Sequence, residues 1–404
     1  MKLQKPATLT DRYSTLSAAR ISLALLMTIL LVFSDGVAFA QEPTSTCASN
    51  GWTTAGTLVG GTALETFSAV VHGQYMYTIG GAQYNTTTGY FTGYNTVGYT
   101  RLTSSGNLTS NFTATSALKR EVSRDLCGKS YTTGGTTYLY TIGGVDYTGG
   151  AQHGQTTGDY EYATITGTGT VGTWTRVQNA ITPTQLHASV VLNGYLYVIG
   201  GSTTSTDSQP VNGITANVYH AQIMSGGVLG PFVQDLTLPV PTYKTCPVVY
   251  DNTIYLSGGE IETTGKCSPT NPAATTNVLY AKQGAGGYLV ANTQTGTWNY
   301  ATSMTQRLAS QAVVYNDGIA LIGGDTVGCS PDTADIEYGT FQDLGDNPPT
   351  EILWTYPYPS SSISLPNAIE RNAGATYGNV IYSLGGEPAG NGGNDTANVE
   401  CLVI

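Results

Sequence analysis

The chain has 404 residues, of which 51 are glycine and 28 are tyrosine, and only 10% are Asp, Glu, Lys or Arg. Helix surfaces are normally covered by Lys, Glu and Arg, so this composition excludes a largely helical protein and favours an all-β one. The net charge of −11 excludes nucleic acid as a partner, because binding its phosphates requires clustered Lys and Arg.

The first forty residues have the pattern of a secretory signal peptide. Basic residues precede a 13-residue apolar run from Ile21 to Phe33, and the small-x-small sequence Ala38-Phe39-Ala40 follows. Crossing a bilayer takes about 20 apolar residues, so cleavage is favoured over an uncleaved anchor. We predict residues 1–40 as a signal peptide and residues 41–404 as the exported chain, with no membrane span after cleavage. Secretion, periplasmic retention and surface attachment all stay open.

An apolar run that ends in two glycines recurs six times along the exported chain. The diglycines are Gly80-Gly81, Gly143-Gly144, Gly200-Gly201, Gly258-Gly259, Gly323-Gly324 and Gly385-Gly386. Their spacing of 57 to 65 residues indicates a repeat architecture, in which one unit cannot bury its own apolar faces. Two apolar runs, Val190–Leu192 and Tyr195–Ile199, flank Asn193-Gly194 and predict a β-hairpin whose second strand ends at a diglycine.

Large aromatic residues keep the same phase as the diglycines, at steps of 56 to 66 residues. A third strand is predicted between the two markers, for example over Asn217–Ile223. The aromatic residues are predicted to begin a fourth strand, and they are Trp52, Phe112, Trp174, Phe232, Trp298 and Trp354. Each unit is therefore predicted to be a four-stranded antiparallel sheet.

These features resemble the kelch repeat, which combines an apolar strand ending in Gly-Gly with a downstream Tyr and a later Trp. The resemblance covers nearly all of residues 50–404 and implies an all-β, six-bladed kelch-type β-propeller with four-stranded antiparallel blades. Kelch units are typically about 50 residues long, whereas these are longer, so longer loops are expected. Residues 41–404 would then form one domain, which we expect to be a monomer.

The two ends of the exported chain match a shared last blade. Gly51-Trp52 is a fourth-strand marker, and Thr396–Ile404 echoes the predicted third-strand segment Thr215–Ile223. We therefore predict that the N-terminal strand joins the C-terminal blade and closes the ring. Such an interlock leaves no free interface between the first and last blades.

All six cysteines lie beyond the predicted cleavage site, and an even count in an exported chain indicates disulfides. Cys47 and Cys401 flank the predicted seam, where a bridge would lock the ring. Cys267 is a further candidate, paired with either Cys329 or Cys246. No C-x-x-C and no zinc-ligand spacing of Cys and His is present, so no structural metal is predicted.

Three units place an acid directly after the diglycine: Glu260, Asp325 and Glu387. By the repeat register these acids should lie near one rim, where carboxylates could bind a cation or a hydroxyl-rich ligand. The alternative is that each carboxylate caps a loop or pairs with a cation that precedes a first strand, namely Lys244, Arg307 or Arg371.

The loop from Ala82 to Thr100 carries Tyr84, Tyr90 and Tyr94 among short polar residues. Tyrosines in such a setting are adaptable contact residues, and they can stack on sugar rings. The alternative is that these aromatic side chains pin a long loop to its own blade.

No motif for a specific reaction is present. The four histidines occupy different repeat positions, and no nucleophile, zinc-protease, phosphate-loop or dinucleotide motif occurs in the right context. We therefore predict no catalytic residue, no metal and no cofactor. The favoured function is noncatalytic recognition of a glycan or an extracellular protein at the loop-rich face. Two alternatives stay open: a carbohydrate-active enzyme, such as the sugar mutarotases or oxidases found among kelch propellers, and a structural cell-surface component.

Overall fold

Short strands form almost all of the regular structure in the computed structural model. It describes residues 46–404 apart from 126, 151–152, 206–212, 262–273, 306, 326–331, 343–347, 359–362 and 390–394. The signal peptide predicted for residues 1–40 lies outside the described residues. Besides strands, the described part of the chain contains three short 3₁₀ helices, η1 (Val59–Gly61), η2 (Ser225–Gly227) and η3 (Ala285–Gly287), and no α-helix. None of its helices has the length and apolarity needed to cross a membrane.

Among the described residues, six four-stranded antiparallel sheets form the main part of the fold, and we number them 1 to 6 with their strands ordered from first to fourth. Sheet 1 contains β2 (Ser68–His72), β3 (Tyr75–Ile79), β6 (Val97–Arg101) and β7 (Thr113–Ala114). Sheet 2 contains β9 (Lys129–Thr133), β10 (Thr136–Ile142), β13 (Tyr160–Thr164) and β14 (Thr175–Val177). Sheet 3 contains β15 (Ala188–Leu192), β16 (Tyr195–Ile199), β17 (Val218–Gln222) and β18 (Val233–Gln234). Sheet 4 contains β19 (Pro247–Tyr250), β20 (Thr253–Ser257), β21 (Val278–Lys282) and β22 (Asn299–Tyr300). Sheet 5 contains β23 (Gln311–Tyr315), β24 (Gly318–Ile322), β25 (Ile336–Phe341) and β26 (Ile352–Tyr358). Sheet 6 contains β28 (Ala373–Tyr377), β29 (Val380–Leu384), β31 (Asn398–Val403) and β1 (Thr53–Thr57).

Three small sheets form next to the ends of the second strands. They are β4 (Ala82–Asn85) with β5 (Tyr90–Gly93), β8 (Val122–Ser123) with β11 (Val145–Asp146) and β12 (Gln155–Thr156), and β27 (Ile369–Glu370) with β30 (Glu387–Pro388). The prediction of an all-β fold built from four-stranded antiparallel sheets is confirmed.

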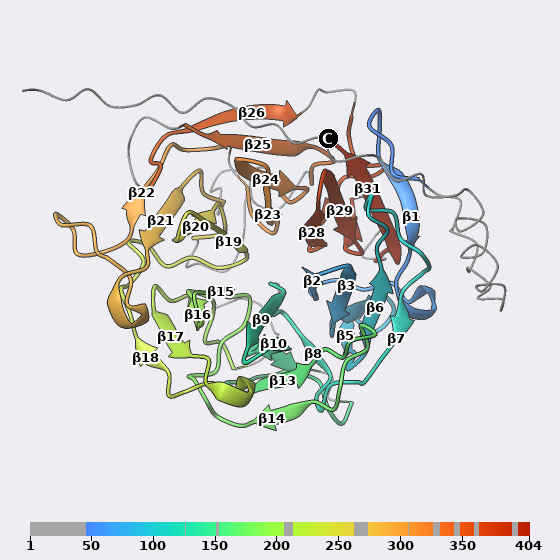
Figure 1. The fold of residues 1–404 in the computed structure, drawn as a ribbon, viewed down its shortest axis with the longest axis horizontal. Helices are drawn as coiled ribbons and strands as arrows, with labels where there is room; N and C mark the ends of the chain where they lie inside the picture. Colours follow the sequence, from blue (N-terminus) through green and yellow to red (C-terminus); the bar gives the residue numbers. More distant parts are fainter. Residues whose placement is uncertain are drawn as a thin grey trace, which may run out of the picture. The chain divides into compact units, whose positions relative to one another are not determined.

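The first strands of the six sheets lie innermost, around a common centre (Figure 1). Going round, β2 contacts β9, β9 contacts β15, β15 contacts β19, β19 contacts β23, β23 contacts β28, and β28 contacts β2. The fourth strand of sheet 6 is the N-terminal β1, which pairs with β31. This arrangement is β-propeller-like.

The hairpins and diglycines follow from local backbone requirements. Asn193 and Gly194, between β15 and β16, both have positive φ, as a two-residue hairpin turn requires. Each diglycine directly follows a second strand, and in sheet 3 a Cβ on Gly200 would lie 2.2 Å from the Thr242 carbonyl oxygen. The N–H of Gly201 donates to that same oxygen at 2.9 Å. The diglycine thus packs one sheet against the segment that enters the next.

The core lies between neighbouring sheets. Tyr77 and Ile79 of sheet 1 pack with Leu139 and Trp174 of sheet 2 in one buried cluster, and similar clusters join the later sheets. The Trp174 indole N–H donates to the Ser116 carbonyl oxygen, which precedes sheet 2, at 2.8 Å. Five of the six aromatic markers directly precede a fourth strand, and the sixth lies within β26. The aromatic markers therefore recur at the same period as the diglycines because the same kind of contact between neighbouring sheets recurs.

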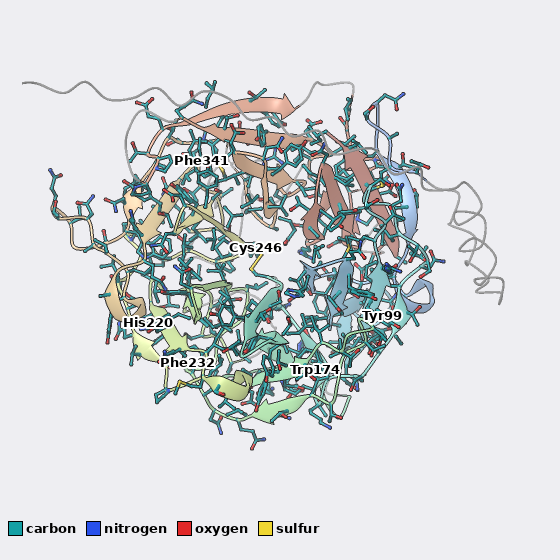
Figure 2. The ribbon with its side chains drawn as sticks, viewed as in Figure 1. Tyr99, Trp174, His220, Phe232, Cys246 and Phe341 are labelled. Atoms are coloured by element: carbon teal, nitrogen blue, oxygen red, sulfur yellow. A yellow bond between two sulfur atoms is a disulfide. The ribbon has the colours of Figure 1, made fainter. Side chains whose placement is uncertain are left out.

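Two disulfides are present among the described cysteines. Cys47–Cys401 ties the segment before β1 to β31, as predicted for the seam. The predicted pairing of Cys246 with Cys267 is wrong, because Cys246 is bonded to Cys127. The two residues lie just before β19 and β9, and Figure 2 shows Cys246 near the centre, where the entries to different first strands converge. Cys267 and Cys329 lie outside the described residues.

Candidate functional site

Six residues that lie just before the first strands have left-handed backbone conformations, with φ between 52° and 63°. In chain order they are Thr66, Arg124, Leu186, Lys244, Ala309 and Arg371. From the second member on, each backbone N–H donates to the carbonyl oxygen of the preceding member at 2.9–3.2 Å, and the Thr66 N–H donates to Arg371 at 3.0 Å. These six hydrogen bonds form a closed cycle, which we call the central cycle.

A cavity of about 330 Å³ lies at the central cycle, and all six members line it. The other lining residues are Glu65, Tyr84, Phe91, Glu370 and Glu387. Backbone pairing brings the acids there: Glu370 lies opposite Glu387 in the β27–β30 ladder, and Glu65 bridges to Ala82 in β4. We call this space the central cavity.

Arg371 holds three carboxyl groups of the cavity wall together. Its Nη1 lies 3.1 Å from Glu65 Oε2 and 2.6 Å from Glu387 Oε2, and its Nη2 lies 3.0 Å from Glu370 Oε1. Glu65 is fully buried, and its Oε1 has no hydrogen-bond partner among the described residues. This wall therefore offers a guanidinium group beside carboxyl oxygens that retain hydrogen-bonding capacity.

The carboxyl groups of this wall are harder to ionise than carboxyl groups in water. Burial raises the pKa of Glu65, Glu370 and Glu387, and Arg371 only partly offsets it. Burial, followed by the nearby Glu65, raises the pKa of Asp395 to about 8. The carboxyl groups of the wall therefore bind a proton more readily than carboxyl groups in water, and a protonated carboxyl group donates as well as accepts hydrogen bonds.

The other two cations of the cavity are also held in place by partners. Arg124 Nη1 donates to Gln185 Oε1 at 2.7 Å, and its guanidinium carbon lies 5.3 Å from the centre of the Phe91 ring. Lys244 Nζ lies 2.6 Å from Glu260 Oε2. The cavity is thus lined by fixed donors, fixed acceptors and aromatic rings.

Glu260, Asp325 and Glu387 were predicted to share a rim. Two of these three acids form ion pairs with cations named in the alternative interpretation. Glu387 pairs with Arg371 and lines the cavity, whereas Glu260 pairs with Lys244 and is not among the lining residues. Both carboxylates therefore help to position cations at the cavity. The shared position after the diglycine does not place both of them in the lining of the cavity.

The third acid, Asp325, is not among the lining residues and clusters with Asp332 and Glu370, and the carboxyl oxygens of these three residues lie within 4.8 Å of one another. Burial, then a hydrogen bond to Asp325 and the charge of Glu370, raises the pKa of Asp332 to about 8. Arg307, the remaining cation of the alternative interpretation, pairs with Glu337 at 3.3 Å.

The three predicted tyrosines divide between the cavity and the hairpin that carries them. Tyr84 lines the cavity, and its ring centre lies 5.1 Å from that of Phe91. Tyr90 packs edge-on against His153 at 5.1 Å, and the Tyr94 hydroxyl donates to a glutamine of β4 at 3.2 Å. Neither Tyr90 nor Tyr94 is among the lining residues. The β4–β5 hairpin is therefore pinned to its surroundings while it presents one tyrosine to the cavity.

Sequence analysis did not identify Glu65, Arg124 or Glu370 as site residues. All three lie in the segments that enter the first strands, where no shared residue type marks the position. A usable signal is the phase itself, because members of the central cycle recur at the same period as the diglycines.

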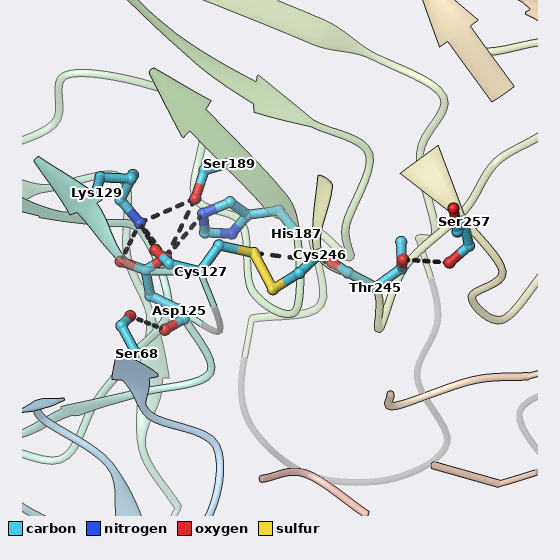
Figure 3. Close-up of a disulfide and its surroundings, with 9 residues drawn as sticks. All are labelled: Ser68, Asp125, Cys127, Lys129, His187, Ser189, Thr245, Cys246 and Ser257. Atoms are coloured by element: carbon cyan, nitrogen blue, oxygen red, sulfur yellow. Dashed lines mark hydrogen bonds and ion pairs between the residues drawn. A yellow bond between two sulfur atoms is a disulfide. The ribbon is translucent and has the colours of Figure 1, made fainter. Parts of the chain in front are cut away.

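A second charged cluster lies beside the Cys127–Cys246 disulfide (Figure 3). Lys129 Nζ lies 2.7 Å from Asp125 Oδ1, and His187 Nε2 lies 3.7 Å from the same oxygen. All three side chains are almost fully buried, and burial lowers the pKa of His187 to about 4. Because solvent does not reach these groups, we interpret the cluster as a structural brace between the entries to sheets 2 and 3.

Comparison with known proteins informs the fold alone. Neither a model of a known protein family nor a curated protein matches the sequence. The solved structure of YjhT is similar to this chain, with a TM-score of 0.57 and 13% sequence identity, over 84% of this chain and 94% of YjhT. At this identity the similarity concerns the β-propeller-like arrangement of sheets and carries no activity over.

Proposed function

We propose that the protein is an exported, six-bladed kelch-type β-propeller whose central cavity binds a glycan without converting it. The six-membered central cycle supports the blade number and a closed ring, because its last hydrogen bond joins sheet 6 to sheet 1. The two disulfides support export, since disulfides persist in oxidising compartments.

The observation that carries the glycan proposal is the mixed lining of the central cavity. Sugar hydroxyl groups both donate and accept hydrogen bonds, and Glu387, Glu370 and Arg371 offer both roles on one wall. Tyr84 and Phe91 add aromatic faces on which an apolar sugar face can stack. A volume of about 330 Å³ is at the small end of ligand pockets, which favours the end of a glycan over a long internal segment.

A glycan array probed with the exported protein tests this proposal, with binding constants then measured for any positive glycan. We expect Glu387→Gln and Tyr84→Ala each to weaken binding by about tenfold or more, because each removes a contact worth about 1.5 kcal/mol or more. Tyr300→Ala is the control, because Tyr300 is exposed on β22, the outermost strand of sheet 4. Binding that survives both cavity substitutions contradicts the proposal, and failure to bind any glycan turns it towards a protein ligand.

A carbohydrate-active enzyme is the second candidate, and the raised pKa values of the cavity carboxyl groups favour it. Glu65 and Glu387 flank Arg371 and exchange protons closer to neutral pH than ordinary carboxyl groups. One carboxylate could take the proton of an anomeric hydroxyl while a carboxylic acid donates a proton to the ring oxygen, as ring opening requires. NMR exchange between α and β anomers of a bound sugar tests this. If the protein exchanges the anomers no faster than buffer does, mutarotase activity is excluded.

A further inference from the structure

Two acids without an assigned role, Asp325 and Asp332, lie in a cluster with Glu370 of the cavity wall, at the junction of sheets 5 and 6. Each residue presents a carboxyl oxygen within 4.8 Å of those of the other two. Backbone pairing sets this proximity, because Asp325 bridges to Asp332 and the Gly324 N–H donates to the Ile369 carbonyl oxygen at 2.7 Å. The main chain therefore holds three acids together.

One oxygen of this cluster lacks the partner that its burial demands. Asp325 is 5% exposed, and its Oδ1 has no hydrogen-bond partner among the described residues. Leaving a buried carboxylate oxygen without a hydrogen-bond partner destabilises the folded protein. Arg371 reaches Glu370, but it also binds Glu65 and Glu387, so it does not neutralise the cluster alone. A bound cation would supply the missing partner.

We propose that Asp325, Asp332 and Glu370 bind one Ca²⁺ ion beside the central cavity. Carboxylate oxygen is the preferred ligand of hard cations, and the set contains no His or Cys that would favour zinc or copper. Oxygens around one Ca²⁺ can lie up to about 5 Å apart, because Ca–O distances are about 2.3–2.6 Å. Around Mg²⁺ the corresponding limit is about 4 Å, so every separation up to 4.8 Å fits Ca²⁺ but only the shorter ones fit Mg²⁺.

The site would leave coordination positions open, because Ca²⁺ takes about 6–8 oxygen ligands and each of the three residues offers one oxygen to the cluster. Glu370 also lines the central cavity, so the ion would lie next to that cavity. The cation site does not depend on the proposed glycan binding and is tested without a glycan.

The test is isothermal titration of the chelator-treated full chain with CaCl₂ and, separately, with MgCl₂. We expect one Ca²⁺ per chain and weaker binding of Mg²⁺. The variant Asp325→Asn/Asp332→Asn should lower the Ca²⁺ affinity by more than about tenfold. The matched control Asp251→Asn/Asp317→Asn removes two exposed carboxylates in hairpin turns and should bind Ca²⁺ as the wild type does.

Thermal unfolding gives a second readout that also shows whether each variant folds. Ca²⁺ should raise the Tm of the wild type and of the control, because a ligand that binds only the native state stabilises it. It should leave the Tm of Asp325→Asn/Asp332→Asn unchanged, and the single variant Asp332→Asn serves if the double variant fails to fold. The proposal is overturned if the wild type binds no Ca²⁺, if Mg²⁺ binds more tightly, or if the folded cluster variant binds Ca²⁺ as tightly as the wild type.

Discussion

The six residues of the central cycle adopt a conformation that side chains normally avoid. A left-handed backbone costs a residue with a Cβ about 1–2 kcal/mol, yet none of the six is glycine. The hydrogen bonds of the cycle hold these residues in place and turn three of their charged side chains, Arg124, Lys244 and Arg371, to the cavity lining. Such strain at the wall of a cavity is typical of a functional site, where surrounding structure offsets its cost.

Ala309 tests this strain without touching a charge. It has φ of 52°, so Ala309→Gly should relieve strain and leave stability unchanged or raise it by up to about 1 kcal/mol. Ala320→Gly is the matched control, because Ala320 lies buried in the extended strand β24 and its replacement should cost about 1 kcal/mol. Denaturant unfolding measures both. Equal destabilisation by the two substitutions would contradict the interpretation of strain.

His187 makes stability depend on pH through the buried brace. Its pKa is about 4 in the folded protein and about 6.5 when exposed, so the unfolded chain binds the extra proton more readily. The stability that this difference provides is fully present above about pH 6.5 and is lost as the pH falls towards 4, by about 3 kcal/mol in total. The gap in unfolding free energy between the wild type and His187→Gln should therefore narrow over that range. A constant gap would show that the pKa of His187 is the same in the folded protein and in the unfolded chain.

At the scale of elements, a tyrosine hydroxyl on the second strand links most sheets to the next sheet. The Tyr140 hydroxyl of β10 donates to the Gly227 carbonyl oxygen beyond β17 at 3.0 Å, and Tyr77 of β3 donates to Gly169 beyond β13 at 2.9 Å. Tyr197, Tyr255 and Tyr382 make the corresponding bonds in later sheets, whereas sheet 5 has Ala320 at this position. In the described part of the chain, the tyrosine of the repeat therefore connects five of the six blade-like sheets to the next.

Tyr140→Phe removes one of these connections while keeping the ring. We expect a loss of about 1 kcal/mol, because the Gly227 carbonyl loses a buried donor and the apolar contacts remain. Tyr288→Phe is the control, since this side chain is 52% exposed and its hydroxyl can reach water. Chemical unfolding measures the loss of stability in both variants, which are compared when their m-values equal that of the wild type. Equal stability of the two variants would remove the proposed role of the tyrosine.

Local patterns predicted the strands well and the site only in part. Period-two runs, Asn193-Gly194 and the diglycines act over a few residues, so they located the hairpins correctly. The Cys127–Cys246 disulfide joins sheets 2 and 4, which are not neighbours. Its formation depends on how the segments that lead into the first strands of different sheets converge. Glu65 and Glu370 reach the cavity through pairing across the ends of second strands. No local pattern reports contacts of this kind.

At the scale of the whole molecule, the N-terminal strand is held to the C-terminal sheet in two ways. β1 pairs with β31 along Thr53–Thr57, and the Cys47–Cys401 disulfide joins the same two segments. Without β1, the outer edge of β31 would present unpaired N–H and C=O groups and uncover buried Val399. An exposed edge of this kind pairs readily with another chain.

A chain that begins at Leu58 should therefore unfold at a lower temperature and associate in solution. The variant Cys47→Ser/Cys401→Ser is the matched control, because it loses the disulfide, at a cost of about 2–5 kcal/mol, but keeps β1. Size-exclusion chromatography with light scattering should find the control monomeric and the shortened chain oligomeric, and a peptide of residues 46–57 should reverse that association by restoring the strand. A shortened chain that stays monomeric with the Tm of the control would show that β1 is dispensable, and that the contact of β28 with β2 and the central cycle keep the sheets together without it.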